Sequence, residues 1–150
     1  MTTIVTNRKV MASDRLIVQG YSKIETDDKL VLLKRGKEKR LVGIAGALSD
    51  ALRWRAWYSD NWYKAPSKQE PSPGGDCDGL VLEPTGHVYL YSQGSGIPIE
   101  ILGPFVGIGT GRDWALGALS AGADIKTAMA ITESYDAYSG GGIHLMDFSD

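Results

Sequence analysis

Thr2 is the first residue in the sequence whose chemistry suggests a function. Initiator methionine is normally removed when a small residue follows it, so we expect the mature chain to begin with Thr2. A terminal threonine carries a hydroxyl nucleophile and an α-amino group, and such an amine has an ordinary pKa of about 7.7–8.0. The amine can therefore accept the hydroxyl proton, directly or through a water, and so activate the nucleophile. Taken alone, the same residue also fits an ordinary threonine at the edge of a sheet.

Five short motifs that follow Thr2 in a fixed order favour the chemical interpretation. They are Thr2-Thr3-Ile4-Val5, Ala12-Ser13-Asp14, Gly43-Ile44-Ala45-Gly46, Gly107-Ile108-Gly109-Thr110-Gly111 and Asp136-Ala137-Tyr138-Ser139-Gly140-Gly141. Together they resemble proteasome β-subunits and the bacterial threonine peptidase HslV over nearly the whole chain. The segment between the first long helix and Gly79 is shorter than in those relatives. The resemblance implies a single N-terminal-nucleophile hydrolase domain over residues 1–150, an α+β fold built as a four-layer αββα sandwich.

The same resemblance implies a threonine peptidase that cleaves peptide bonds through an ester on Thr2, with its own amine as base. Asp14 matches the acid that follows the first hairpin, and it would hold a lysine charged and in place. Lys29 fits the spacing of that lysine better than Lys23, which stays open as the alternative. An ammonium beside the hydroxyl lowers the cost of forming an alkoxide. Gly46 matches the glycine whose backbone N–H faces the developing oxyanion.

Four further residues take roles from the resemblance. Asp136 and Ser139 match a pair that supports the terminal amine, although Ser139 before three glycines also fits an ordinary helix C-terminal cap. Thr110 stands where the relatives usually carry serine; it keeps the hydroxyl and adds a methyl group. Ile44 matches a position that lines the specificity pocket, which implies a modest apolar preference at the cleaved bond, and it could equally be a core residue.

The elements that must position these residues can be read from the pattern. Two hairpins are expected at the start, one over residues 2–14 and one pairing 29–33 with 40–44 around Gly36. The apolar spacing predicts a helix from about Ala47 to Asn61, followed by a loop over residues 65–75. Strands are expected over 79–82, 87–92 and 105–108, helices over 112–119 and 124–135, and a final strand over 143–148. Strands and helices that come in separate runs indicate a layered α+β domain.

Composition excludes several other classes of protein. The chain has 150 residues, a net charge of −2 and one cysteine, Cys77, which fits one soluble domain without an intramolecular disulfide. The basic run at residues 34–40 is interpreted as a solvated hairpin turn rather than a nucleic-acid contact. The apolar runs are too short to span a bilayer, and the N-terminus carries no apolar signal segment. We therefore expect a cytoplasmic protein with no membrane or nucleic-acid partner.

Three alternative functions stay open. The glycine turn at residues 107–111 could cradle a phosphate at a helix start, but it lacks the spacing of a nucleotide-binding fingerprint. The chain could be a catalytically silent structural subunit with the same fold, or an amidase that acts on small amides. The resemblance implies a peptide or unfolded-protein substrate, a homo-oligomeric ring and a possible ATP-dependent unfoldase partner. The mechanism needs no metal or organic cofactor.

Overall fold

The computed structural model describes residues 2–150, and the expected removal of Met1 concerns the residue outside them. Within residues 2–150 the chain forms eleven β-strands and three α-helices. The strands are β1 Thr3–Thr6, β2 Met11–Asp14, β3 Leu16–Gln19, β4 Ser22–Glu25, β5 Leu30–Arg35, β6 Glu38–Gly46, β7 Cys77–Leu82, β8 Val88–Tyr91, β9 Ile99–Ile101, β10 Val106–Gly109 and β11 Ile143–Met146. The helices are α1 Leu48–Asn61, α2 Arg112–Ser120 and α3 Ile125–Tyr135, with short 3-10 turns at Pro66–Lys68 and Ser92–Gly94.

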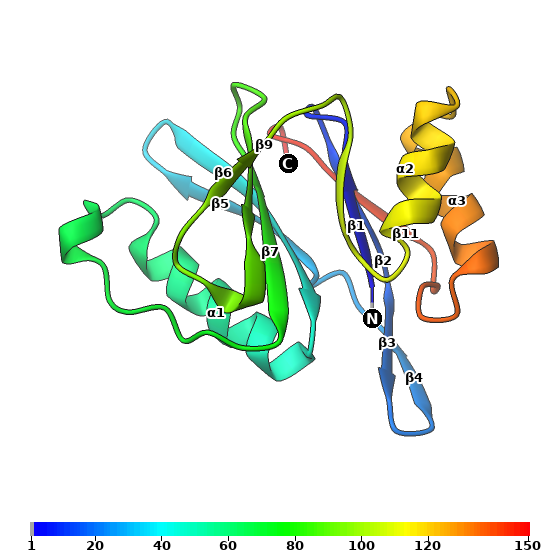
Figure 1. Ribbon diagram of the computed structural model, residues 1–150, viewed down its shortest axis with the longest axis horizontal. Helices are drawn as coiled ribbons and strands as arrows, with labels where there is room; N and C mark the ends of the chain where they lie inside the picture. The colour runs from blue at the N-terminus through cyan, green and yellow to red at the C-terminus, as the bar shows by residue number, and fades with distance from the viewer. Residues whose placement is uncertain (1) are drawn as a thin grey trace.

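Two antiparallel sheets pack face to face and carry the helices on their outer faces (Figure 1). The smaller sheet has the strand order β10-β1-β2-β11, and α2 and α3 cover its outer face. The larger sheet has the order β5-β6-β7-β8-β9, and α1 covers its outer face. The layers therefore run helix, sheet, sheet, helix, which confirms the α+β sandwich expected from the sequence.

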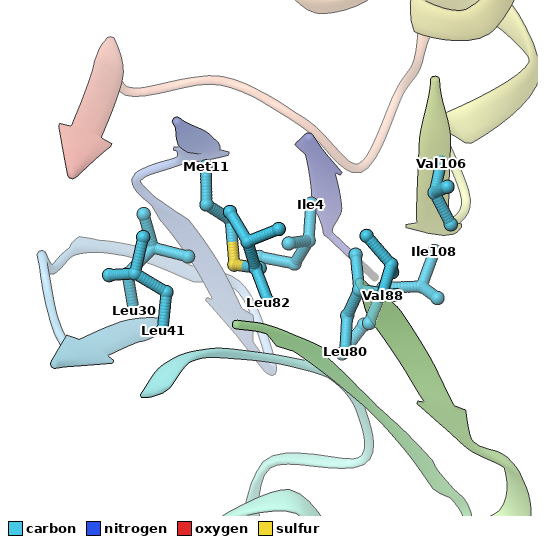
Figure 2. Close-up of a cluster of buried hydrophobic side chains, with 10 residues drawn as sticks. Ile4, Met11, Leu30, Leu41, Leu80, Leu82, Val88, Val106 and Ile108 are labelled. Carbon is cyan, nitrogen blue, oxygen red and sulfur yellow. The ribbon is translucent and has the colours of Figure 1, made fainter. Parts of the chain in front are cut away.

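The central core lies between the two sheets (Figure 2). Ile4 and Met11 enter it from the smaller sheet, and Leu41, Leu80 and Leu82 enter it from the larger one, all fully buried. Side chains alternate along a strand, so the neighbour of Ile4, Val5, points instead toward α2 and α3. Strand β1 is buried on both faces, which explains its unbroken β-branched sequence.

Helix α1 packs through Trp54, whose side chain is fully buried against the larger sheet. Ala51, Trp54 and Tyr58 lie three and four residues apart, so they share one face of the helix. A Cβ at Gly79 on β7 would overlap the Trp54 ring, so this close approach requires glycine. Trp54 therefore fills the core between α1 and the larger sheet.

Most of the expected elements are present, and the basic run at residues 34–40 is indeed a hairpin turn. Arg35 pairs with Glu38, and Gly36 adopts a φ of 61° in the turn between β5 and β6. The sequence interpretation missed two features, the β3–β4 hairpin and the three-residue strand β9. All four residues of β4 are exposed, so no alternation of apolar and polar residues signals a strand there.

None of the helices within residues 2–150 has the length and apolar character that crossing a membrane requires.

Candidate functional site

The beginning of β1, the end of β2 and the beginning of β5 meet at one end of the sandwich. Thr2 immediately precedes β1, Asp14 is the last residue of β2, and Lys29 immediately precedes β5. All three are buried, with exposed fractions of 3%, 0% and 6%. The antiparallel pairing of β1 with β2 brings Thr2 next to Asp14 although twelve positions separate them in sequence.

The Lys29 ammonium makes three hydrogen bonds in this cluster. It donates to Thr2 Oγ1 at 2.5 Å, to Asp14 Oδ1 at 2.9 Å and to the Leu16 carbonyl oxygen at 2.5 Å. The Thr2 hydroxyl in turn donates to Asp14 Oδ1. A neutral lysine amine has only two hydrogens, so serving all three acceptors requires the protonated ammonium.

Asp14 is a fully buried carboxylate that several donors surround. Its Oδ1 atom accepts the Thr3 N–H at 3.1 Å in addition to Thr2 and Lys29. Its Oδ2 atom accepts the N–H groups of Leu16 at 3.3 Å and Gly140 at 3.1 Å. Donors on both oxygens compensate for the loss of water around a buried charge.

Burial and charge act on Lys29 in opposite directions. Loss of water lowers the pKa of the Lys29 ammonium from its usual value, and this effect is the larger one. The neighbouring Asp14 carboxylate, by charge and by hydrogen bonding, raises the pKa and offsets part of that decrease. The ion pair therefore holds a lysine that gives up its proton more easily than one in water.

Lys23, the alternative lysine, lies elsewhere. It is exposed on β4, in the middle of the β3–β4 hairpin, and pairs across that hairpin with Val18. The structure thus brings Lys29, and not Lys23, to Thr2.

Gly46 ends β6 beside the same cluster. The Ile44 N–H bonds to the Lys29 carbonyl oxygen on the β5 side, and the Ala47 N–H bonds to the Asp76 carbonyl oxygen on the β7 side. Backbone N–H groups alternate in direction along a strand, so the Gly46 N–H points to the β5 side, where β5 itself has not yet begun. It is directed toward the space beside Lys29 rather than toward a partner strand.

The backbone around position 46 itself requires glycine. In the structure Gly46 has a φ of 111°, and a Cβ would lie 2.5 Å from the Asp76 carbonyl oxygen and 2.7 Å from Cys77 Cα. The close approach of β7 and the positive φ therefore already require glycine.

Two cavities adjoin Gly46. A small one of about 50 Å³ is lined by Thr2, Lys29 and Gly46 together with the apolar side chains of Ile17, Ile44, Ala45, Leu48 and Ala51. Ile44, which lines this small cavity, is 3% exposed and belongs to the core under α1 as well. A larger, open cavity of about 410 Å³ shares Ala45 and Gly46 and extends to Thr110 and the start of α2.

Asp136, Ser139 and Thr110 form a second polar cluster next to Thr2. Asp136 Oδ2 accepts the Ser139 hydroxyl at 2.5 Å and the Thr110 hydroxyl at 2.8 Å. Thr110 Oγ1 also lies 3.4 Å from the Thr2 carbonyl oxygen. Asp136 is at the same time the C-terminal cap of α3, its N–H bonding to the Thr132 carbonyl oxygen. Capping and membership of the cluster therefore coexist in one residue.

Glycines of the 107–111 turn serve to admit the N-terminal strand. A Cβ at Gly109 would overlap the Thr2 carbonyl group, and a Cβ at Gly111 would overlap the Thr3 hydroxyl. These close approaches give a reason for the glycines that involves no phosphate. They also bring Thr3, which the sequence interpretation did not single out, into the polar cluster, since Thr3 Oγ1 lies 2.7 Å from Ser139 Oγ.

Glu133 on α3 is a half-buried acid near the cluster that the sequence interpretation missed. Its Oε1 atom is buried and has no hydrogen-bond partner among the described residues. Burial raises the pKa of Glu133, the Asp14 charge adds to the increase, and the Gly142 N–H and Arg15 partly oppose it. Among residues 2–150, His, Cys, Asp and Glu side chains do not gather in threes in a way that could hold a metal ion.

Solved structures with the same architecture identify the fold. The chain has the N-terminal-nucleophile hydrolase fold of the proteasome and HslV type. It is similar to HslV from Trypanosoma brucei, with 20% sequence identity, a TM-score of 0.65 and coverage of 97% of this chain and 98% of that one. It is also similar to BPH from Thiobacillus denitrificans in complex with epoxomicin, with 18% identity, a TM-score of 0.60 and 99% of both chains covered.

A third similar structure is Anbu from Hyphomicrobium sp. strain MC1. The identity is 14% and the TM-score 0.74, with 98% of this chain and 82% of that chain covered. No protein-family model matches the sequence, and no curated protein matches it either. At 14–20% identity these structures establish the fold of the chain and leave its chemistry to be argued from its own residues.

Proposed function

We propose that this protein is an N-terminal threonine hydrolase that cleaves peptide bonds through the Thr2 hydroxyl once Thr2 is the first residue. The observation that carries the proposal is the position of Lys29, whose ammonium donates to both Thr2 Oγ1 and Asp14 Oδ1 in a buried cluster. A cation at hydrogen-bond distance from a hydroxyl stabilises the alkoxide that forms as its proton leaves. An ordinary threonine in a strand has no need of this arrangement.

The reaction is acyl transfer in two halves. Thr2 Oγ1 attacks the amide carbonyl carbon while the Thr2 α-amine takes the hydroxyl proton, and the Gly46 N–H donates to the oxyanion. The amine then gives that proton to the leaving nitrogen as the C–N bond breaks, which leaves an ester on Thr2. Water, activated by the same amine, hydrolyses the ester and restores the hydroxyl. Asp136, Ser139 and Thr110 position the amine through their shared hydrogen bonds.

The small cavity supports a preference at the cleaved bond. Its volume of about 50 Å³ and its walls of Ile17, Ile44, Leu48 and two alanines fit a small apolar side chain on the residue before that bond. A charged side chain would lose its water there without gaining a partner other than Lys29. We propose Ile44 as a residue that lines this pocket.

Two other functions are distinguishable from this one. A structural subunit without activity would have no need to bury an ion pair against Thr2, because a buried ion pair is a poor source of stability. A small-amide amidase would use the same groups, and only the length of the preferred substrate separates it from a peptidase. We further propose that residues 1–150 form one domain that works as a cytoplasmic homo-oligomeric ring, with unfolded chains as substrate and an ATP-dependent unfoldase as a possible partner.

The test uses a chain that begins at Thr2, incubated with a peptide epoxyketone, a reagent that closes a ring with a terminal amine and its adjacent hydroxyl. We expect one inhibitor mass on Thr2 by intact-mass spectrometry and cleavage of unstructured peptides. Thr2→Ala should remain folded and lose activity by at least about 10³-fold. Lys29→Ala should lose about 10²–10³-fold, whereas Lys23→Ala, the matched control, should stay close to the wild-type protein. Undiminished cleavage by Thr2→Ala would end the proposal.

A further inference from the structure

Thr3, next to the proposed nucleophile, occupies a central place between the two polar clusters. It is fully buried, its N–H donates to Asp14 Oδ1 at 3.1 Å, and its hydroxyl lies 2.7 Å from Ser139 Oγ. One residue therefore contacts the Asp14–Lys29 cluster through its backbone and the Asp136 cluster through its side chain. Gly111 leaves space for that hydroxyl, because a Cβ there would overlap Thr3 Oγ1.

The number of hydrogens fixes the direction of each hydrogen bond in the Asp136 cluster. Asp136 as a carboxylate only accepts, so the hydroxyls of Ser139 and Thr110 both donate to it. Each hydroxyl has a single hydrogen, and Ser139 has now used its own. Thr3 must then be the donor to Ser139. Thr110 has likewise used its hydrogen on Asp136, so it makes no second donation to the Thr2 carbonyl oxygen 3.4 Å away, and its place there keeps Asp136 close to the main chain of Thr2.

We propose that Thr3 is a positioning residue that sets the protonation of the Thr2 amine through Ser139 and Asp136. By donating to Ser139, the Thr3 hydroxyl keeps the Ser139 hydrogen directed at Asp136. That hydrogen bond disperses the negative charge of the carboxylate nearest to Thr110. A carboxylate with dispersed charge stabilises the ammonium form of the Thr2 amine less than a carboxylate with its full charge does. More of the amine is then neutral, and the neutral form is the one that accepts a proton. This inference rests on the proposed function of Thr2, which it extends to a neighbouring residue.

Removal of the Thr3 hydroxyl should therefore raise the pKa of the Thr2 amine. In Thr3→Val the side chain keeps its branched shape, but Ser139 is free to turn away from Asp136 and leaves more charge on that carboxylate. The charged or titratable groups on the elements around Thr2 are the same in both proteins. They are Asp14 on β2, Lys29 before β5, Cys77 and Asp78 on β7, Arg112 and Asp113 on α2, Lys126, Glu133 and Tyr135 on α3, and Asp136 after α3.

The experiment titrates the Thr2 amine directly, by NMR of ¹⁵N-threonine-labelled protein that begins at Thr2, and follows peptide cleavage over the same pH range. We expect the amine pKa of Thr3→Val to lie about half a unit or more above that of the wild-type protein. The acid limb of kcat/KM should move to higher pH by the same amount, and Thr3→Ser should restore both. Thr6→Val is the matched control, since it removes another buried hydroxyl on β1 that bonds only locally, to Val10 and Arg8.

The outcomes separate this inference from the proposed function. An unchanged amine pKa in Thr3→Val, with an active wild-type protein, overturns the role of Thr3 and leaves the hydrolase standing. A second outcome is a shifted amine pKa in Thr3→Val together with a wild-type protein that neither cleaves peptides nor reacts with the epoxyketone. That result keeps the role of Thr3 and overturns the hydrolase. A shift of equal size in Thr6→Val would reduce Thr3 to a residue that merely holds the strand in place.

Discussion

At the residue scale, the Lys29–Asp14 pair is costly to bury and is surrounded accordingly. Removing two charges from water costs several kcal/mol per ion, and their attraction restores this only when the remaining donors and acceptors are satisfied. Here both carboxylate oxygens and all three ammonium hydrogens have partners, several of them backbone groups. The backbone at the ends of β1, β2 and β5 thus determines where these charges can lie, and that place is beside Thr2.

Glu133 lies in the same region, but its buried Oε1 atom has no hydrogen-bond partner among the described residues, which leads to a prediction about pH. Its pKa is raised in the folded protein, so between the unfolded and the folded pKa the folded state binds more protons. The free energy of unfolding that Glu133 contributes is therefore full below the unfolded pKa and is lost as the pH rises through the folded pKa. We expect Glu133→Gln to raise the urea midpoint at pH 7.

The same substitution should give little or no gain near pH 4, where the wild-type side chain is already largely protonated. Glu25→Gln, on the exposed strand β4, is the control and should change the midpoint little at either pH. A gain for Glu133→Gln that is equal at both pH values would show that charge is not the cause.

At the element scale, the contact between α1 and β7 depends on a glycine. A Cβ at Gly79 would meet the ring of fully buried Trp54, and a core that is already filled cannot move the ring aside cheaply. We expect Gly79→Ala to lower the free energy of unfolding by about 1–3 kcal/mol, measured by urea denaturation.

Gly117 in the middle of α2 is the matched control, because nothing lies within 4 Å of its missing Cβ. Gly117→Ala should raise the free energy of unfolding by about 0.5–1 kcal/mol, since alanine is the better helix former. If Gly79→Ala also stabilised the protein, the close packing of Trp54 on β7 would be wrong.

Elements with a strong apolar period could be predicted from the sequence, and those without one could not. Helix α3 was predicted over residues 124–135, and in the structure Asp124 is its N-cap, with a side chain that accepts the Thr127 N–H at 2.7 Å. The β3–β4 hairpin escaped notice because β4 buries nothing, and β9 because it has only three residues beside Pro98. Among the site residues, Thr2, Asp14 and Lys29 could be picked out from the sequence because the chain resembles a known family.

The rest of the site depends on contacts between distant segments. In the sequence Thr3 looks like one more β-branched residue in a strand. Its hydroxyl has a partner only in the folded protein, where Ser139, 136 positions later in the chain, lies beside it. Glu133 reads as a polar residue on a helix, and its burial follows from the packing of α3 on β2 and β11. Neither position carries a local pattern that could have indicated its surroundings.

At the scale of the whole molecule, the proposed ring makes a prediction about mass. Large apolar side chains are exposed at separate places on the surface, with Tyr21 on the β3–β4 turn and Ile97 and Leu102 on either side of β9. Apolar side chains exposed singly, as these are, are common on any protein surface, so the mass and not the surface tests the ring. We expect light scattering at micromolar protein to give a multiple of the 16.2 kDa chain mass. A mass of one chain would contradict the ring.

The turn of the β3–β4 hairpin is a place where the chain could be cut into two fragments. The hairpin projects from the end of the sandwich where the N-terminus lies (Figure 1), and its turn at Gly20 and Tyr21 is exposed. A break in this turn yields a short piece with Thr2 and Asp14 and a long piece with Lys29 and Gly46. Neither piece holds the nucleophile together with its ammonium. Thr2 would then become reactive only when the two fragments bind each other, so labelling of Thr2 would measure their association.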